Sequence, residues 1–284
     1  MKKIMVTGAS GYIGKNFIKR YSGEYDIQSV SLSLGFPTSF LGVNTLIHLS
    51  ALVHQTKEYS DSRYFEINTQ QTELLAKEAK KQGVTHFVFF STVAVYGVNG
   101  YLNNQIKVID EESDCHPVSA YAKSKFAAER ILLNMGTDDF KVSIVRPPIV
   151  YGKGCPGNMK SLKALIRRVP ILPFNYQNNK RSMVNIENLL YFTKLIIDEK
   201  AAGVFIPQDA DTYSIKQIAS VLSAGMGKKI LLFKFPRVVF NVLVQIKPQV
   251  MSSLYGTLVF DSTVSNQKIK YVEQITTEEG LRSM

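Results

Sequence analysis

The sequence has no tryptophan and only two cysteines, Cys115 and Cys155, among its 284 residues. The two cysteines form neither a metal-binding spacing nor a framework of pairs, so we expect no metal site. Reduced thiols of this kind are typical of a cytoplasmic protein. No apolar run reaches the length of about 18 residues that a membrane span needs. Gly8, Ser10 and Gly11 interrupt the apolar run behind the first lysines, which argues against a signal peptide.

Acidic residues are outnumbered, with 23 Asp+Glu against 34 Lys+Arg and a formal net charge of +11. The basic residues are scattered rather than grouped in blocks, so we expect no nucleic-acid interface. An anionic small substrate or cofactor would suit the charge, and so would a plain solvated basic surface. A hydrophobic content of 45% and a charged content of 20% are typical of a soluble globular protein.

A glycine-rich turn near the amino terminus is the first motif. Residues 3–7 form an apolar strand, Gly8, Gly11 and Gly14 follow, and residues 15–21 have helical periodicity. Strand, glycine turn and helix are the context of a dinucleotide-binding fingerprint. Gly8 allows the tight turn, Gly11 lets backbone N–H groups approach a pyrophosphate, and Gly14 allows close helix packing. A glycine-rich turn that binds nothing is the alternative.

The second strand, residues 26–33, lacks the acidic residue that usually ends such a strand in an NAD site. Ser31 and Ser33 stand there instead. The absence removes charge repulsion against a 2′-phosphate and mildly favours NADPH. Lys15 is a candidate partner for that phosphate, or simply a solvated lysine. The connection over residues 34–44 is too short for another strand before the buried strand at residues 45–51.

Strands and helices alternate from there: a helix at 64–82, a strand at 85–91, a helix from residue 121 and a strand at 141–146. This alternation predicts an α/β fold, a Rossmann-like doubly wound parallel sheet with a smaller C-terminal substrate-binding domain. We expect residues 1–151, with a return segment at 183–208, to form the NAD(P)-binding domain. Residues 152–182 and 209–284 would form the second domain. The apolar stretch 236–246 favours a core-packed helix over membrane association.

Tyr121 and Lys125 are four residues apart, so they share one face of a helix. A phenol titrates near pH ~10, and an adjacent ammonium stabilises the phenolate and lowers its pKa. The spacing is weak evidence alone, because any helix can contain it. Ser91 and Thr92 add to it, since they follow the apolar strand at 85–91, and ligands of open α/β sheets bind beyond the carboxyl ends of strands.

Taken in order, these stretches resemble the extended short-chain dehydrogenase/reductase superfamily, in its nucleotide-sugar epimerase/dehydratase/reductase branch. The resemblance covers essentially the whole chain and rests on residues 7–14, 48–51, 68, 91–97, 117–129, 146–152 and 180–188. It implies that Thr92 hydrogen-bonds the sugar C4 oxygen and that Tyr121 is the acid/base. It also implies that Lys125 bonds the nicotinamide ribose and lowers the pKa of Tyr121.

The resemblance implies a set of binding residues as well. Those on the cofactor are Gly8, Ser10, Gly11, Tyr12, Ile13, Gly14, Ser31, Ser33, Leu49, Ser50, Ala51, Asn68, Ser91, Tyr121, Lys125, Pro148 and Ile149. Those on the substrate are Thr92, Val93, Asn158, Phe174 and Arg181, with Arg181 clamping the diphosphate. Ordinary loop roles for Asn158 and Phe174 are equally open.

The resemblance leaves more than one reaction open. The resemblance favours bacterial reductases that use NADPH or NADH on the 4-keto group of a UDP-linked 6-deoxy-N-acetylhexosamine, in surface-polysaccharide precursor synthesis. The alternative is an NAD-dependent 4-epimerase of a UDP-hexose or UDP-N-acetylhexosamine, and a third is a cofactor-binding regulator without catalysis. Val93 and Ala94 replace the acidic pair of dehydratases, which disfavours that reaction. The resemblance also implies a homodimer through a four-helix bundle of the helices at 64–82 and 121–134.

Overall fold

The centre of the fold is one six-stranded parallel sheet. The computed structural model describes residues 1–37, 39–53, 59–102 and 107–284. The strand order is β10-β6-β4-β3-β1-β2, and each neighbouring pair is parallel. The strands are β1 (Lys3–Thr7), β2 (Asp26–Val30), β3 (Thr45–His48), β4 (His86–Phe90), β6 (Lys141–Val145) and β10 (Gly203–Phe205). The predicted Rossmann-like α/β fold is confirmed.

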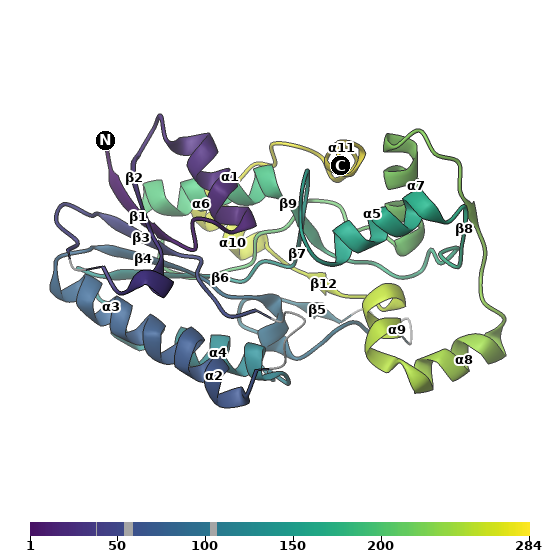
Figure 1. Ribbon diagram of the computed structural model, residues 1–284, viewed down its shortest axis with the longest axis horizontal. Coiled ribbons are helices and arrows are strands. Elements are labelled where there is room, and N and C mark those ends of the chain that lie inside the picture. The colour runs from purple at the N-terminus through teal and green to yellow at the C-terminus, as the bar shows by residue number, and fades with distance from the viewer. Residues whose placement is uncertain (38, 54–58, 103–106) are drawn as a thin grey trace.

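Helices cover both faces of this sheet (Figure 1). One layer holds α1 (Tyr12–Tyr21), α6 (Ile186–Glu199) and α10 (Thr263–Ile269), and the other holds α2 (Asp61–Phe65), η2 (Glu66–Gln70), α3 (Gln71–Lys81) and α4 (Ala120–Met135). Side chains alternate between the layers along β1, because strand periodicity is two. Ile4 packs with Phe17 in the first core, whereas Met5 packs with Leu75 in the second.

The connection after β2 agrees with the expectation of a missing strand. The described residues between β2 and β3 contain the short helix η1 (Leu32–Leu34) and no strand. β2 pairs with β1 alone among the described strands, so it forms one edge of the sheet. The adenosine end of a dinucleotide bound beyond β1 would therefore meet an edge with less protein around it.

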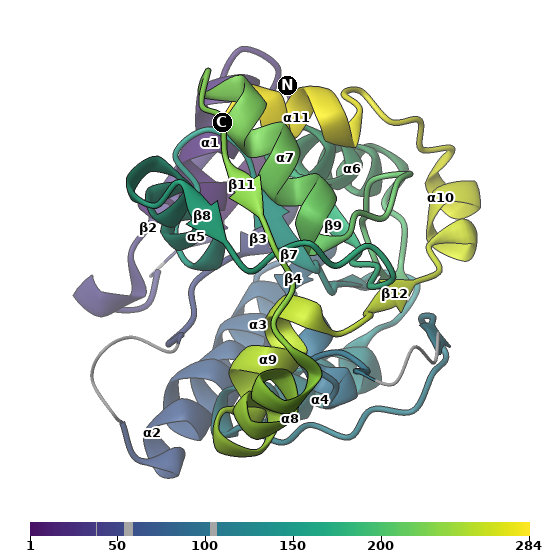
Figure 2. The ribbon, with the colours of Figure 1, turned by 90° about the vertical axis from the view of Figure 1, so that its right-hand side faces the viewer.

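The second half of the molecule is built from short pieces around its own core. Three two-stranded pairs join distant segments: β7 (Ile149–Tyr151) with β9 (Met183–Asn185), β5 (Val108–Ile109) with β12 (Val259–Phe260), and β8 (Ile171–Leu172) with β11 (Leu231–Leu232). Between them lie η3 (Val93–Tyr96), α5 (Asn158–Arg168), α7 (Ile215–Gly225), α8 (Arg237–Ile246), α9 (Pro248–Tyr255) and α11 (Thr277–Arg282). Figure 2 shows α8 and α9 stacked below α7. The predicted domain limits remain a prediction.

Within the described part of the chain, the helices fall short of the length and apolarity that crossing a membrane requires.

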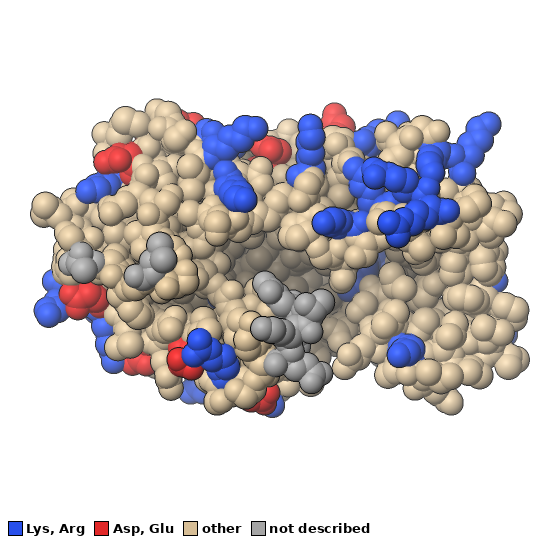
Figure 3. Space-filling view, in the orientation of Figure 1, with Lys and Arg blue, Asp and Glu red and all other residues tan. Residues whose placement is uncertain are grey.

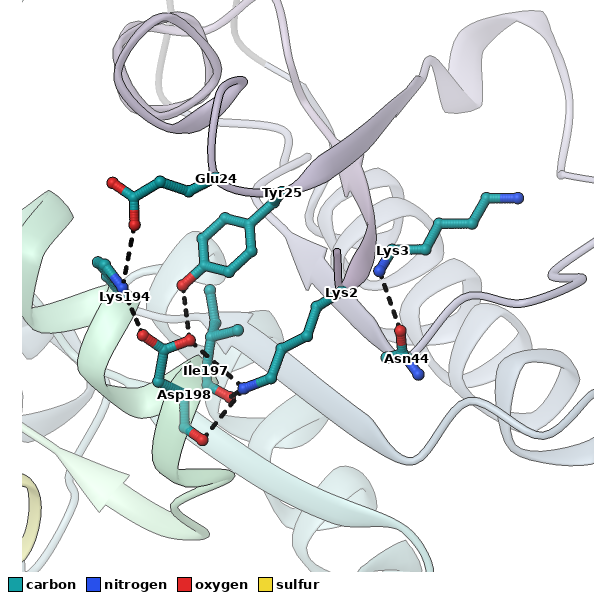
Figure 4. Close-up of polar contacts among 8 residues, drawn as sticks. All are labelled: Lys2, Lys3, Glu24, Tyr25, Asn44, Lys194, Ile197 and Asp198. Atoms are coloured by element: carbon teal, nitrogen blue, oxygen red, sulfur yellow. Dashed lines mark hydrogen bonds and ion pairs between the residues drawn. The ribbon is translucent and has the colours of Figure 1, made fainter.

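A polar cluster fixes the amino ends of the strands to α6 (Figure 4). Asp198 accepts a hydrogen bond from the Tyr25 hydroxyl at 2.8 Å and from Lys2 Nζ at 3.3 Å. Lys194 adds a second ion pair to the same carboxylate. These contacts lie at the end of β1 away from the glycine turn, so they anchor the sheet and leave its carboxyl edge free for chemistry.

Candidate active site

The residues predicted to bind cofactor gather along the carboxyl edge of the sheet. Ser31 follows β2, Gly8 follows β1, Leu49 follows β3, Ser91 follows β4 and Pro148 lies beyond β6. Parallel strands place these ends side by side, which is where open α/β sheets bind ligands. Figure 3 shows the surface hollowed between the half that holds the sheet and the half that holds α5.

The glycine turn fits a dinucleotide. Gly8 has φ +70, and a Cβ there would lie 2.7 Å from the Leu49 carbonyl carbon. A Cβ on Gly14 would lie 2.6 Å from the Gly8 oxygen, so neither position tolerates a side chain. Gly11 donates its N–H to Gly8 at 3.0 Å and caps α1. Ser10 and Gly11 are exposed, so the positive end of α1 is open to phosphate groups.

The edge strand ends without a carboxylate. The Ser31 and Ser33 hydroxyls, both exposed, hydrogen-bond each other at 2.8 Å. The chain contains no acidic residue between Asp26 and Glu58. Lys15 is exposed on the first turn of α1. Discrimination between NAD and NADP at this edge stays a prediction.

A π-helical turn, which the sequence did not reveal, positions Asn68. The helix from residue 61 to 81 contains the π turn η2 at Glu66–Gln70, a feature frequent at functional sites. Asn68 is 1% exposed; it accepts from the Leu52 amide at 2.7 Å and donates to the Ser124 hydroxyl at 3.1 Å. Thr69 donates to the Ser124 carbonyl at 2.8 Å. Asn68 therefore ties the segment beyond β3 to α4.

His48 is a structural member of the same network. Its Nδ1 lies 2.7 Å from Thr7 Oγ1 and its Nε2 lies 2.9 Å from Thr72 Oγ1. Because Thr72 donates its proton to the Asn68 carbonyl, it must accept from Nε2–H, and Thr7 donates to Nδ1. Burial lowers the pKa of His48 to about 3, so the ring is neutral.

The predicted catalytic side chains come from β4 and α4. Thr92 follows β4 and caps η3, where its Oγ1 accepts from the Ala94 amide at 3.1 Å. Ser119 caps α4 in the same way. Lys125 Nζ lies 3.9 Å from the centroid of the Phe89 ring near the end of β4. α4 also packs against η3, so Tyr121, Lys125 and Thr92 belong to elements in direct contact.

The electrostatics of the tyrosine–lysine pair differ from the expectation. The sequence predicted that Lys125 lowers the pKa of Tyr121, but burial raises the pKa of Tyr121 to about 12. Burial also lowers the pKa of Lys125 to about 7, and Glu129 opposes this shift. The predicted lowering of the Tyr121 pKa by Lys125 is wrong for the protein alone, because burial is the cause that shifts Tyr121 and it acts in the opposite direction. A bound nicotinamide would supply the hydride and, when oxidised, a positive charge.

Sequence reasoning missed a buried ion pair next to this site. Arg146 Nη2 lies 2.6 Å from Glu129 Oε2, and their side chains are 5% and 0% exposed. Arg146 also donates to the Tyr96 hydroxyl at 2.8 Å. Glu129 is one helical turn beyond Lys125 and therefore lies on the same face of α4. An acidic residue at that spacing was the signal in the sequence that could have indicated a charge next to the site. The pair joins α4 to the ends of β6 and η3.

Two of the predicted substrate residues line one cavity. Asn158 at the start of α5 and buried Phe174 border a cavity of about 430 Å³. The remaining lining comes from α5 and from residues in or next to α9, namely Ser161, Leu162, Leu165, Gln249, Val250, Ser253 and Leu254. Val93 donates its amide to the Pro147 carbonyl at 3.3 Å, so it lies beside the segment carrying Pro148 and Ile149.

Arg181 has a different environment from the one predicted. Its guanidinium donates to the carbonyls of Ser252 and Gly256 at 3.1 Å and of Asn99 at 3.0 Å. Its Nε is buried without a hydrogen-bond partner among the described residues, and burial lowers its pKa to about 10. Three carbonyls hold this cation, so the diphosphate clamp stays a prediction.

Comparison with known proteins supports the family resemblance. The model of the NAD dependent epimerase/dehydratase family matches residues 4–206. The UDP-glucose 4-epimerase of Vibrio cholerae is 28% identical, covering 99% of this chain and 94% of the relative. The N-acetyl-alpha-D-glucosaminyl-diphospho-ditrans,octacis-undecaprenol 4-epimerase of Escherichia coli O157:H7 is 27% identical, covering 80% and 73%.

Among solved structures, the UDP-glucuronic acid 4-epimerase of Bacillus cereus in complex with NAD superposes with a TM-score of 0.78. It is 18% identical and covers 99% of this chain and 96% of its own. That likeness supports the fold, and the family match spans most of the chain, including the glycine turn, Thr92, Tyr121 and Lys125. The chain belongs to the NAD dependent epimerase/dehydratase family of extended short-chain dehydrogenases/reductases, enzymes that act on nucleotide sugars.

Proposed function

We propose that this protein transfers a hydride between a nicotinamide cofactor and C4 of a diphosphate-linked sugar. Two contacts support the proposal: α4, which bears Tyr121 and Lys125, packs against η3, which Thr92 caps, and Lys125 lies over the Phe89 ring of β4. Tyr121 exchanges the proton of the C4 oxygen, and Thr92 holds that oxygen. Lys125 orients the ribose and stabilises charge near Tyr121.

The net reaction we favour is 4-epimerisation, with NAD as a retained cofactor. Two relatives are named as 4-epimerases, and the match with this chain spans 73% or more of the length of each. An epimerase removes the C4 hydride to NAD and returns it to the other face of the same sugar. This ranks the epimerase above the UDP-4-keto-6-deoxy-N-acetylhexosamine reductase that the sequence favoured.

Reduction of a 4-keto sugar by NADPH or NADH is the second candidate. The observation in its favour is the open edge beyond β2, where Ser31 and Ser33 stand without a carboxylate. A cofactor held loosely at its adenosine end exchanges between turnovers, as a reductase requires. Either reaction uses the same three catalytic residues.

The substrate is proposed to be a UDP-hexose or UDP-N-acetylhexosamine. The names of the two relatives share a sugar attached through a diphosphate, to uridine in one and to undecaprenol in the other. The cavity beside Asn158 and Phe174 lies in the half that the sequence assigned to this ligand. We further propose that the enzyme works in the cytoplasm as a homodimer formed through α3 and α4, where Leu74 and Leu133 are exposed.

The deciding experiment is mass spectrometry of the denatured purified protein, followed by assays of both reactions. Retained NAD and interconversion of UDP-glucose with UDP-galactose, or of their N-acetyl counterparts, support the epimerase. No bound nicotinamide, together with loss of NADPH absorbance on addition of a UDP-4-keto-6-deoxy sugar, supports the reductase instead.

Tyr121→Phe is the matched control, because it removes one hydroxyl and keeps the ring. We expect it to lower either activity by at least about a hundredfold while NADH binding persists. Unchanged turnover in this variant would contradict the assignment of Tyr121 and with it the proposed mechanism.

A further inference from the structure

Helix α8 has two apolar faces, and one of them meets no other part of the described protein core. Phe240, Leu243 and Val244 turn inward, where Phe240 packs on Tyr176 and Tyr255. None of the residues of α8, all of which the structure describes, is buried. The sequence-based expectation of a core-packed helix is therefore right for one side of α8 only.

The outward face of α8 is a continuous apolar stripe. Val238, Val242 and Ile246 follow one another at intervals of four residues, which places them in one row. Their exposed fractions are 75%, 48% and 64%. Val239 borders the row, with 43% exposed. Contiguous exposed apolar surface is typical of interaction sites, whereas singly scattered apolar residues are ordinary.

The charge around the stripe has one sign. Three exposed basic residues flank α8: Lys234 precedes the helix, Arg237 is its first residue, and Lys247 directly follows it. The chain contains no acidic residue from position 212 to 260, nor from position 140 to 186. The second of these segments includes α5, whose basic side chains are Lys160, Lys163, Arg167 and Arg168.

The basic surface over α5 and part of the surface of α8 can be seen from the same side of the molecule (Figure 3). Figure 3 shows Lys and Arg gathered over α5, on the face that also presents the surface of α8 and α9. The hollow between the two halves opens on this face too. An amphipathic helix with exposed aliphatic residues and flanking Lys/Arg lies in the plane of a lipid interface, and anionic headgroups attract the basic residues.

We propose that α8, with the basic surface over α5, docks this protein on an anionic membrane surface, with Val238, Val242 and Ile246 in the interface. Two segments free of acidic residues match a negatively charged plane of lipid headgroups better than a second copy of this chain, which would present the same positive charge. The inference does not depend on the sugar reaction proposed above.

Vesicle co-sedimentation of the full chain tests this directly. Vesicles of phosphatidylcholine are compared with vesicles that contain one third phosphatidylglycerol, at low and high salt. We expect binding to the anionic vesicles that weakens as salt rises. Val242→Asp and Ile246→Asp should each weaken that binding by about tenfold, because a carboxylate replaces an aliphatic contact and meets like charge.

Val264→Asp is the matched control, since Val264 is 62% exposed on α10, away from the stripe. It should bind anionic vesicles as the unmodified protein does, and all variants should unfold at the same temperature. Absence of vesicle binding, equal binding to both lipid compositions, or an unaffected Val242→Asp variant would each overturn the proposal. Self-association that Val242→Asp abolishes, without any lipid binding, would assign the stripe to a second copy instead.

Discussion

Lys125 is buried at a high energetic cost, which makes its replacement a sharp test of the site. The side chain is 1% exposed, and burial lowers its pKa from 10.5 to about 7. At about 1.4 kcal/mol per pH unit, a fall of this size means that burying the ammonium costs roughly 5 kcal/mol. A catalytic role for Lys125, as proposed above, would explain why the protein keeps a lysine at a buried position.

Lys125→Met removes the charge and retains an unbranched apolar stem in the same space. The variant loses the contact of Nζ with the Phe89 ring, which is worth about 2 kcal/mol when desolvated. We therefore expect it to be more stable than the unmodified protein by about 1–3 kcal/mol at pH 7. Cofactor-dependent turnover should be abolished.

The lowered pKa of Lys125 also predicts how the free energy of unfolding changes with pH. The unfolded chain binds the Lys125 proton more tightly than the folded chain, so the stability of the unmodified protein rises as pH rises from about 7 toward 10.5. The stability advantage of Lys125→Met should accordingly shrink by roughly 2 kcal/mol between pH 7 and pH 9. Below pH 7 the advantage is largest, because the folded protein then carries the full buried charge.

Urea unfolding at the two pH values, followed by circular dichroism, measures these differences. Lys125→Arg is a useful companion, because it keeps a charge that does not titrate and should be strongly destabilised. A Lys125→Met protein that is less stable than the unmodified one, or a difference that grows with pH, would refute the reasoning.

Three further expectations follow from the same structure. Gly14→Ala should weaken NADH binding by at least about tenfold, measured by calorimetry, since its Cβ would meet backbone at 2.6 Å. Gly23→Ala, with open space around its Cβ, should bind normally. Glu129→Gln should cost about 3–5 kcal/mol in urea unfolding, because Arg146 would be left as a buried unpaired cation; a loss below about 1 kcal/mol would contradict this. Thr92→Val should lower kcat about a hundredfold with unchanged NADH affinity, and a reduced affinity instead would assign Thr92 to the cofactor.

The sequence predicted the parts of the fold that depend on local pattern. The strand over residues 3–7, the glycine turn and the helix behind it are all present, since apolar periodicity and glycine positions specify them directly. The short connection after β2 was predicted from length alone. The strands β5, β8, β11 and β12, which lie outside the central sheet, have two residues each, which is too short for any periodic signal.

The π turn at Glu66–Gln70 escaped prediction for a related reason. Asn68 was expected at the cofactor, but a helical pattern over residues 64–82 does not reveal one extra residue in a turn. Asn68 and Thr69, both in this turn, hydrogen-bond Ser124 on α4. These contacts between distant segments are set by tertiary packing, which a local pattern does not contain.

Burial depth is the second quantity that the sequence does not contain, and here it reversed a chemical expectation. A lysine four residues after a tyrosine was expected to lower the phenol pKa, which holds only where the ammonium stays charged. In this fold Lys125 and Tyr121 are both desolvated, and desolvation favours the neutral form of each group. The pKa of Tyr121 is therefore raised and the pKa of Lys125 is lowered. In the proposed mechanism, a further positive charge at the site would favour the phenolate of Tyr121, and an oxidised nicotinamide would supply such a charge.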